Sequence, residues 1–273
     1  MPKFPHSQTP QSAGSSRPGK GKPQLTKRDL DILRPIGEQT AYRFDQLQGL
    51  LARHPDTKVA NGEFLSETRT SAIIRRWQKL GLVEYRKILY DDPTWVWLTK
   101  QGLSLVHVPA QFHDPSPGNL EHLYWINETR ALIEDTYGTM SGFQWEGERL
   151  MRLTRERLQA QRKKDDMLYI PLEYQGSHRP DALMRYQVLT ESGEQEVVVA
   201  IEVELSEKSY ATWKSIFLEL ARYYTHTLYY ADESIKGSLS KALLRFQNER
   251  PDYDEPGTQR RLSIEIHDVE EVL

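Results

Sequence analysis

The 273-residue sequence predicts a mixed α+β protein with two folded units. Between residues 26 and 80, apolar side chains recur at helical spacing in three segments, and two short strand-like runs follow, ending at Leu98. Farther along, residues 181–204 have the pattern of a strand, a turn at Glu191–Glu194 and a second strand, and a helical pattern comes next. These observations predict a helical unit that ends in a hairpin, followed by a unit built on a sheet.

Composition narrows the class of protein. Hydrophobic residues make up 38% and charged residues 27%, as in a water-soluble globular protein. The absence of cysteine excludes disulfides and thiolate zinc sites. No apolar run approaches the roughly 18 residues typical of a membrane span, so we expect a cytoplasmic protein with no membrane partner.

The net charge of −3 does not by itself indicate a nucleic-acid partner, but the charges are unevenly placed. Residues 1–25 have few aliphatic side chains and predict a disordered basic tail. Such a tail is either simply solvated or an arm that follows a phosphate backbone. Residues 26–106 form the predicted helical unit, residues 107–119 hold three prolines and predict a linker, and residues 120–273 form the second unit.

The third helix of the first unit has a basic outer face. Ser66 can cap a helix from Glu67 to Leu80, and Gly81 ends it. Its apolar side faces inward, and the opposite side is small and basic. The outward positions are Thr68, Ser71, Ala72, Arg75 and Lys79, flanked by Arg69 and Arg76, with Arg86 and Lys87 near the tip of the following hairpin. Such a face suits the major groove of double-stranded DNA, although the same charges also occur on ordinary exposed helices.

The strings RRWQKLGLVEYR (75–86) and LTKQG (98–102) resemble the recognition helix, wing and following helix of a winged helix-turn-helix domain. That resemblance implies DNA binding by Arg69, Ser71, Arg75, Arg76, Lys79, Arg86 and Lys87.

Three carboxylates are predicted to converge at the end of the second unit's hairpin. Side chains alternate along a strand, so Glu202 and Glu204 point the same way. The hairpin returns Asp181 toward them. Three carboxylates at one end of a sheet can hold Mg²⁺, which prefers oxygen ligands. The alternative is a hairpin with a solvated acidic face.

Pro180-Asp181, a turn and a strand ending in Glu202-Val203-Glu204 resemble the PD-(D/E)xK nuclease superfamily, roughly over residues 118–235. The resemblance implies a restriction-endonuclease-like α/β domain with a mixed sheet, and Mg²⁺ or Mn²⁺ held by Asp181, Glu202 and Glu204. It departs from the family pattern at Glu204, where a lysine is usual. Lys208 and Lys214 are candidates for a relocated lysine, and we assign the catalytic role to Lys208.

Two further features bear on this site. Nuclease-like folds often add an early acid, and Glu146 and Glu148 are both candidates. The segment from Arg149 to Lys164 carries seven basic residues against one acid. It is either a wall that holds phosphates beside the carboxylates or a solvated helix.

The order of the two domains, with the strings HRPD and EVELS, resembles the replication-relaxation family of bacterial mobile elements. This resemblance implies a DNA-binding, metal-dependent nuclease acting in plasmid replication, mobilisation or transposition. The rival hypothesis is a non-catalytic regulator or accessory factor that recruits a relaxase, transposase or replication protein. In that case the nuclease-like domain would form a homodimer or bend DNA.

Overall fold

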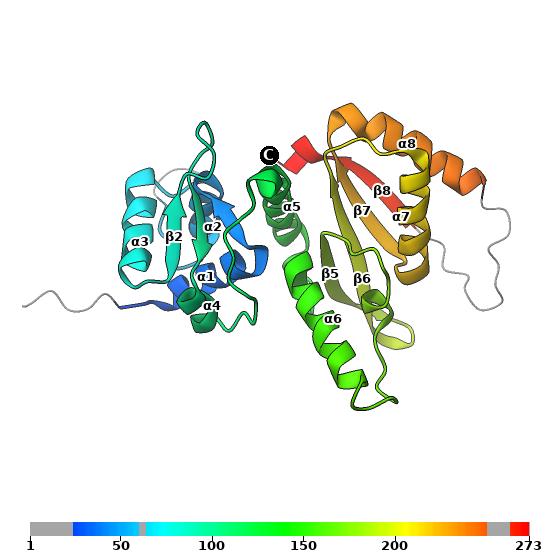
Figure 1. The fold of residues 1–273 in the computed structure, drawn as a ribbon, viewed down its shortest axis with the longest axis horizontal. Coiled ribbons are helices and arrows are strands. Elements are labelled where there is room, and N and C mark those ends of the chain that lie inside the picture. The colour runs from blue at the N-terminus through cyan, green and yellow to red at the C-terminus, as the bar shows by residue number, and fades with distance from the viewer. Residues whose placement is uncertain (1–23, 60–63, 250–262, 273) are drawn as a thin grey trace, which may run out of the picture.

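The computed structural model describes residues 24–59, 64–249 and 263–272, so most of the predicted basic tail lies outside the described residues (Figure 1). The protein is a mixed α+β structure in which a small three-stranded sheet and a mixed five-stranded sheet each carry helices. No helix among the described residues is long and apolar enough to cross a membrane.

The N-terminal unit packs helices against a small antiparallel sheet of strand order β1-β3-β2. Its elements are α1 (Lys27–Gln39), β1 (Ala41–Arg43), α2 (Phe44–Arg53), α3 (Glu67–Lys79), β2 (Val83–Arg86), β3 (Trp95–Leu98) and α4 (Lys100–Leu105). The predicted third helix and hairpin therefore form nearly where expected. Ile74 and Trp77 of α3 are fully buried, which confirms the predicted apolar side of this helix.

The region between the first two helices differs from the prediction. From the sequence, Gly37 is a typical helix end and Thr40 a typical first residue of the next helix, but α1 continues to Gln39 and Ala41–Arg43 form strand β1. This strand pairs with β3, with Ala41 opposite Trp97. Gly37 lies within the helix, and the close packing of Leu98 and Val108 leaves no room for a side chain at this position. The turn therefore comes at Thr40.

Thr40 has an unusual backbone, with φ 85° and ψ −55°. A positive φ is costly for a β-branched residue, and such strain amounts to about 1–3 kcal/mol. We therefore expect Thr40→Gly to raise the free energy of unfolding by about 1 kcal/mol in urea denaturation, after the greater flexibility of glycine in the unfolded chain is deducted. His107→Gly, at φ 56°, is the comparison and should change stability less, because histidine tolerates that region. A loss of stability in Thr40→Gly would contradict this account.

The C-terminal unit is a five-stranded sheet of order β4-β5-β6-β7-β8 between helices. Its elements are α5 (Leu120–Tyr137), β4 (Gln144–Gly147), α6 (Glu148–Arg162), β5 (Ala182–Thr190), β6 (Gly193–Glu204), α7 (Tyr210–Tyr223), β7 (His226–Ala231), α8 (Glu233–Asn248) and β8 (Ser263–Asp268), with short 3-10 turns at Pro117–Asn119, Leu172–Tyr174 and Val269–Val272. The pairs β4–β5 and β5–β6 are antiparallel, whereas the pairs β6–β7 and β7–β8 are parallel.

Alternation along the strands gives the sheet two apolar faces. Ala200 of β6 belongs to the core beneath α7 and α8, whereas Ile201 and Val203 belong to the core beneath α5. Figure 1 shows α7 and α8 on one side of the sheet and α5 on the other, between the sheet and the N-terminal unit. Val199, Ile201 and Val203 therefore lie on the face of the sheet opposite to Glu202 and Glu204.

The two units are joined by buried polar contacts through α5. Asn127 donates from Nδ2 to the carbonyl of Ala41 at 2.9 Å and to Gln46 Oε1 at 3.1 Å. Arg130, also on α5, pairs with Glu38 of α1 at 3.3 Å. All three contacts involve side chains that are buried, so they fix how the units sit against each other.

The connecting segment 107–119 is also tied to the body. Val108 is buried in the N-terminal core, and Asp114 accepts hydrogen bonds from Arg86 and Trp97. Arg149 of α6 donates to the carbonyls of Gly37 and Gln111, each at 2.8 Å. The segment predicted as a linker therefore packs against both units.

Candidate functional site

The three predicted carboxylates lie together at one end of the large sheet. Ala182 pairs with Ile201, so Asp181, which directly precedes β5, lies opposite Glu202 near the end of β6. Asp181, Glu202 and Glu204 all line one hollow of about 440 Å³, together with Lys208. The predicted return of the hairpin is confirmed by this register.

Asp181 is held by two donors. Its Oδ2 accepts the backbone N–H of Val203 at 2.7 Å, and its Oδ1 contacts His122 Nε2 at 2.8 Å. His122 reaches Asp181 from the first turn of α5. Burial alone lowers the pKa of His122, but the hydrogen bond to Asp181 and the nearby carboxylate charges raise it above its usual value. Asp181 therefore favours the protonated form of His122, compared with a free imidazole.

Glu202 is the most perturbed acid of the site. Its side chain is 10% exposed and contacts His178 Nε2 at 2.6 Å. Burial, opposed by His178 and reinforced by the charges of Asp181 and Glu204, raises the pKa of Glu202 to about 7. Burial by itself lowers the pKa of His178, yet its hydrogen bond to Glu202 raises it overall. The carboxyl of Glu202 is crowded by like charges that a bound cation would relieve.

Glu204 is paired with the lysine that we predicted to act in the site. Lys208 contacts Glu204 Oε2, and its ammonium lies 4.9 Å from the ring centre of Trp213. Ser206 donates to the other oxygen of Glu204 at 3.2 Å. Lys208 precedes Ser209, whose side chain caps α7, so the start of this helix fixes where the ammonium lies.

The donor set suits Mg²⁺ or Mn²⁺ in kind, because Asp181, Glu202 and Glu204 supply hard oxygen ligands. Within the described residues, however, no three His, Asp or Glu side chains are arranged as a metal-binding group. Each carboxylate instead meets a nitrogen donor of the protein: His122, His178 and Lys208. A bound cation would therefore compete with these side chains for the carboxylate oxygens.

Other candidates from the sequence lie elsewhere. Lys214 pairs with Glu249 at 2.9 Å and does not line the hollow. Glu146 accepts hydrogen bonds from Tyr174 and Thr154, outside the hollow. Glu148 lies closer, because its backbone N–H donates to the carbonyl of Asp181 at 2.8 Å. Of the two early acids, Glu148 is therefore the neighbour of Asp181.

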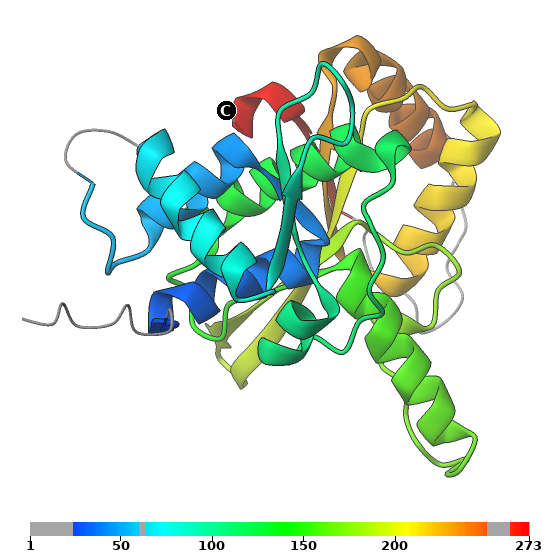
Figure 2. The same cartoon turned by 60° about the vertical axis from the view of Figure 1, so that its left-hand side comes forward.

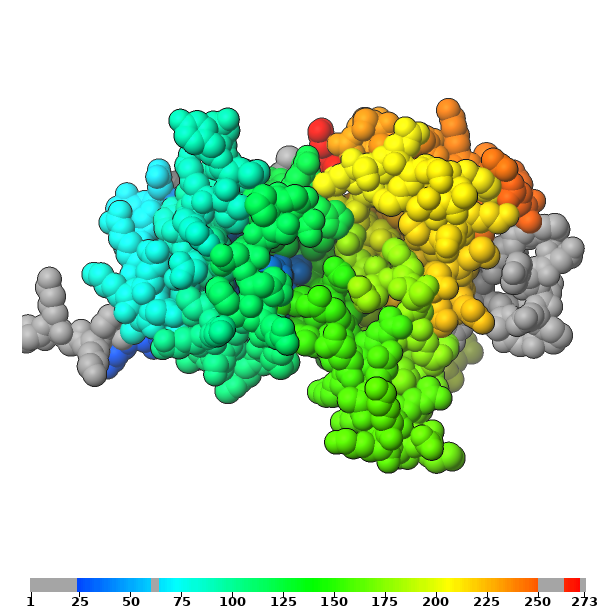
Figure 3. Space-filling view, in the orientation of Figure 1, coloured from blue at the N-terminus to red at the C-terminus, as the bar shows by residue number. Residues whose placement is uncertain are grey.

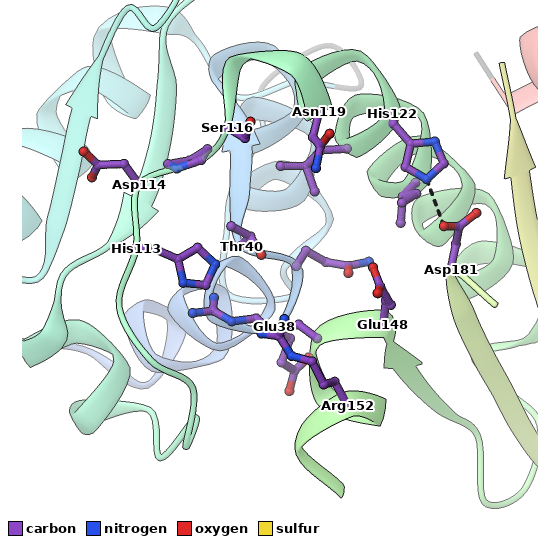
Figure 4. Close-up of a pocket in the computed structure, with 15 residues that line it drawn as sticks. Glu38, Thr40, His113, Asp114, Ser116, Asn119, His122, Glu148, Arg152 and Asp181 are labelled. Carbon is purple, nitrogen blue, oxygen red and sulfur yellow. Dashed lines mark hydrogen bonds and ion pairs between the residues drawn. The ribbon is translucent and has the colours of Figure 1, made fainter. Parts of the chain in front are cut away.

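A second hollow, of about 270 Å³, lies between the two units and is lined by residues of both (Figure 4). Figure 4 shows Thr40, His113, His122, Glu148 and Arg152 around it. It is also lined by Asp181, which therefore borders both hollows. The strained turn at Thr40 and the carboxylate site thus meet at the boundary between the units.

One wall of this cavity contains an unsatisfied amide. Gln39 is 5% exposed, and its Nε2 has no hydrogen-bond partner among the described residues. Buried polar groups are usually hydrogen-bonded, so this amide is a donor that the described residues leave unused. Several acids of the cavity, in contrast, are already paired inside the protein, as Glu38 is with Arg34 and Arg130.

The predicted DNA-contacting residues divide into two groups. Arg75 and Lys79 of α3 are exposed and form no ion pair within the described parts of the chain, and Ser71, one turn before Arg75, is half-buried. Arg76 instead contacts buried Asp29 of α1. Its guanidinium therefore helps to hold α3 against α1.

The remaining predicted contacts are engaged by the protein itself, although they stay exposed. Arg69 donates to the carbonyl of Lys58 at 2.7 Å. Arg86 pairs with Asp114 at 2.7 Å, and Lys87 donates to the carbonyl of Tyr90 at 3.3 Å. Arg75 and Lys79 are consequently the most available cations of the predicted surface.

His122 and His178 are the site residues to which sequence reasoning assigned no role. His178 stands three residues before Asp181 in the HRPD string, a proximity that marks it as a candidate. His122 is 59 residues away from its partner in the sequence, and no local pattern indicates the contact.

The pKa shifts predict that stability falls as pH rises. The pKa of Glu202 in the folded protein, about 7, exceeds its ordinary value of 4.5, and those of His122 and His178 are also raised. The folded protein therefore binds these protons more tightly than the unfolded chain does. The resulting stabilisation is complete at pH values below the ordinary pKa values, and it is lost as the pH rises through the pKa values of the folded protein.

We therefore expect the free energy of unfolding of the wild type to drop by on the order of 2 kcal/mol between pH 5 and pH 8. In Glu202→Gln, which keeps a hydrogen-bonding side chain but cannot ionise, the drop should be clearly smaller. Glu194→Gln, an exposed change on the same hairpin, is the control and should follow the wild type. Parallel pH profiles for wild type and Glu202→Gln in urea denaturation would contradict the assignment.

Comparisons of the chain with protein-family models, curated proteins and solved structures found no match.

Proposed function

We propose that this chain is a double-stranded-DNA-binding protein whose second unit carries a metal-dependent nuclease-like site. The observation that carries the proposal is the shared hollow that holds Asp181, Glu202, Glu204 and Lys208 at the end of β5 and β6. The mixed sheet, in which an antiparallel hairpin is followed by a helix and a parallel strand, supports the resemblance to PD-(D/E)xK nucleases.

Each residue has a distinct chemical role in this proposal. Asp181 and Glu202 would hold Mg²⁺ or Mn²⁺, with Glu204 as a third carboxylate. When bound, such an ion lowers the pKa of a water and offsets charge on a phosphate. Lys208 supplies a positive charge at the rim of the hollow, where it can neutralise a phosphate oxygen once it leaves Glu204. The N–H of Val203 keeps the carboxylate of Asp181 oriented.

The rival function is a non-catalytic DNA-binding regulator or recruitment factor. It is favoured by a specific observation: each carboxylate of the site already has a nitrogen donor from the protein itself. In this alternative the second unit serves as a structural or dimerisation element, and the partner is a relaxase, transposase or replication protein. The resemblance to the replication-relaxation family is compatible with both functions.

Plasmid cleavage separates the two functions. Supercoiled plasmid incubated with the full chain and Mg²⁺ or Mn²⁺ should become nicked or linear. Asp181→Ala should reduce the rate at least about 100-fold, because it removes a metal-binding carboxylate. Glu194→Ala, a change on the same hairpin outside the hollow, should leave the rate unchanged. Equal cleavage by Asp181→Ala would reveal a contaminant, and no cleavage by folded wild type would favour the regulator.

DNA binding is expected to involve the outer face of α3. Arg75→Ala combined with Lys79→Ala removes two exposed cations, so affinity for duplex DNA should fall. The salt slope, which is the slope of the logarithm of the binding constant against the logarithm of the salt concentration, should flatten by about two units. Fluorescence anisotropy over a range of salt concentrations measures both quantities. Lys100→Ala with Lys241→Ala, exposed lysines away from α3, is the control for a change in total charge. An unchanged slope in the α3 variant would remove this helix from the interface.

A further inference from the structure

Helix α6 stands out from the body of the protein. Figure 2 shows it projecting away from both units, and Figure 3 shows it as a prominence of the surface. Met151 is its single buried residue among the described side chains. Because α6 contributes so little to the core, packing does not explain why its surface is rich in basic residues.

The cations of α6 have two different environments. Arg149 binds backbone carbonyls of the N-terminal unit and the connecting segment, so it holds the helix in place. The side chains of the other basic residues form no ion pair or hydrogen bond within the described parts of the chain. They are Arg152, Arg155, Arg157, Arg162, Lys163 and Lys164. Unpaired like charges repel each other, and this repulsion is relieved when an anionic partner binds.

Four of these cations form a stripe along one side of the helix. At 100° per residue, Arg152, Arg155, Arg162 and Lys163 fall within an arc of about 100°, whereas Arg157 and Lys164 point away from it. At 1.5 Å per residue the stripe is roughly 16 Å long. That length spans several phosphates of one DNA strand, which are spaced about 3.4 Å apart along the axis.

The stripe begins at the candidate site. Arg152 lines the cavity between the units together with Asp181 (Figure 4). The first residue of α6, Glu148, is hydrogen-bonded to the carbonyl of Asp181. A backbone lying along the stripe would therefore be led toward the carboxylates.

We infer that α6 is a second DNA-binding surface, on which the stripe Arg152–Arg155–Arg162–Lys163 binds consecutive phosphates of a duplex and directs that strand to Asp181. The inference rests on the proposed DNA-binding function, and it adds the path that the DNA follows across the second unit. An anionic membrane fits less well, because the exposed positions of α6 are polar apart from Ala160 and offer no apolar face to insert.

Two charge-matched variants of the full chain test the stripe. Arg152→Gln with Arg162→Gln removes two exposed stripe cations, and Arg157→Gln with Lys164→Gln removes two exposed cations off the stripe. In anisotropy with a labelled 30-base-pair duplex, the stripe variant should bind roughly tenfold more weakly, with a salt slope lower by about two units. The off-stripe variant should stay within about twofold of wild type. Unchanged melting temperatures show that both variants are folded.

The outcomes separate this inference from the proposed function. If the α3 variant weakens binding and the stripe variant does not, DNA binding stands and the role of α6 is wrong. Equal losses in both α6 variants would mean that only total charge matters, which also overturns the stripe. If wild type does not bind the duplex at all, the proposed function fails with it. Tighter binding to an RNA duplex or to phosphatidylserine vesicles would assign α6 to another partner.

The path of the DNA can be mapped because the chain has no cysteine. An iron chelate attached to Gln159→Cys, on the stripe, should cut a bound duplex within a few base pairs, whereas one on Ala160→Cys, turned away from the stripe, should cut it far less. Similar weak cutting from both positions would show that DNA does not follow this side of α6.

Discussion

Replacing Asp29 by alanine is expected to lower the free energy of unfolding by about 3–5 kcal/mol, although Asp29 lines neither hollow. Asp29 is fully buried in the N-terminal unit, and its carboxylate accepts four hydrogen bonds. Its carboxylate accepts hydrogen bonds from Thr26, as part of the cap of α1, and from Arg76 and Trp77 of α3. These bonds hold its pKa below the usual value, against the effect of burial.

The loss is large because Asp29→Ala leaves its partners without an acceptor. The indole N–H of Trp77 would be buried and unpaired, and Arg76 would lose its counter-ion. Asp31→Ala, two residues along the same helix, removes an exposed carboxylate paired with His54 and should change stability by less than about 1 kcal/mol. Urea denaturation of both variants provides the measurement, and equal effects would contradict the role assigned to Asp29.

This network also changes the interpretation of the proposed DNA surface. Sequence periodicity places Arg76 beside the outer face of α3, and nothing local distinguishes it from Arg75. The structure differs for a physical reason: a buried carboxylate 47 residues earlier requires a cation, and Arg76 is within its reach. Arg76→Ala is therefore expected mainly to lower the free energy of unfolding, whereas Arg75→Ala should lower only the affinity for DNA.

Elements with strong local signals could be predicted from the sequence. Helix α8 (Glu233–Asn248) buries Ala242, Leu243 and Phe246, which recur at helical spacing, and Gly138 follows α5, where a glycine commonly ends a helix. The hairpin of β5 and β6 could be predicted because each strand alternates and a short turn separates them. The same alternation places Glu202 and Glu204 on one side, so the carboxylate cluster of the candidate site was also predictable.

Features that depend on distant parts of the chain could not be predicted. Strand β1 has three residues, and its partner β3 lies more than 50 residues later, so no local pattern favours it over the start of a helix. The histidines of the site meet their carboxylates only through the packing of α5 and of the loop before β5. The polar contacts between the units likewise join residues that are about 80–90 positions apart.

The joint between the units should be sensitive to a single substitution. Arg130 of α5 is 8% exposed at its side chain and pairs with Glu38 at 3.3 Å and with Glu134 at 2.6 Å. Arg130→Ala would leave Glu38 buried with exposed Arg34 as its counter-ion. Breaking a buried ion pair in this way lowers the free energy of unfolding by about 3–5 kcal/mol.

Arg53→Ala is the matched control, because Arg53 of α2 also crosses the joint, pairing with Asp135 of α5 at 3.6 Å. Its side chain is 38% exposed, so its removal should change stability by less than about 1 kcal/mol. Calorimetry should show a large shift of the melting transition for Arg130→Ala and almost none for Arg53→Ala.

The functional consequence concerns the two proposed DNA surfaces, since α3 belongs to one unit and α6 to the other. If α5 holds them in fixed register, Arg130→Ala should weaken binding of a 30-base-pair duplex at temperatures where the variant is still folded. Binding of a short duplex that can reach only α3 should change much less, because it does not depend on the joint. Equal losses for both duplexes would mean that Arg130 supports the N-terminal unit itself, and unchanged affinity for both would mean that the two surfaces act independently.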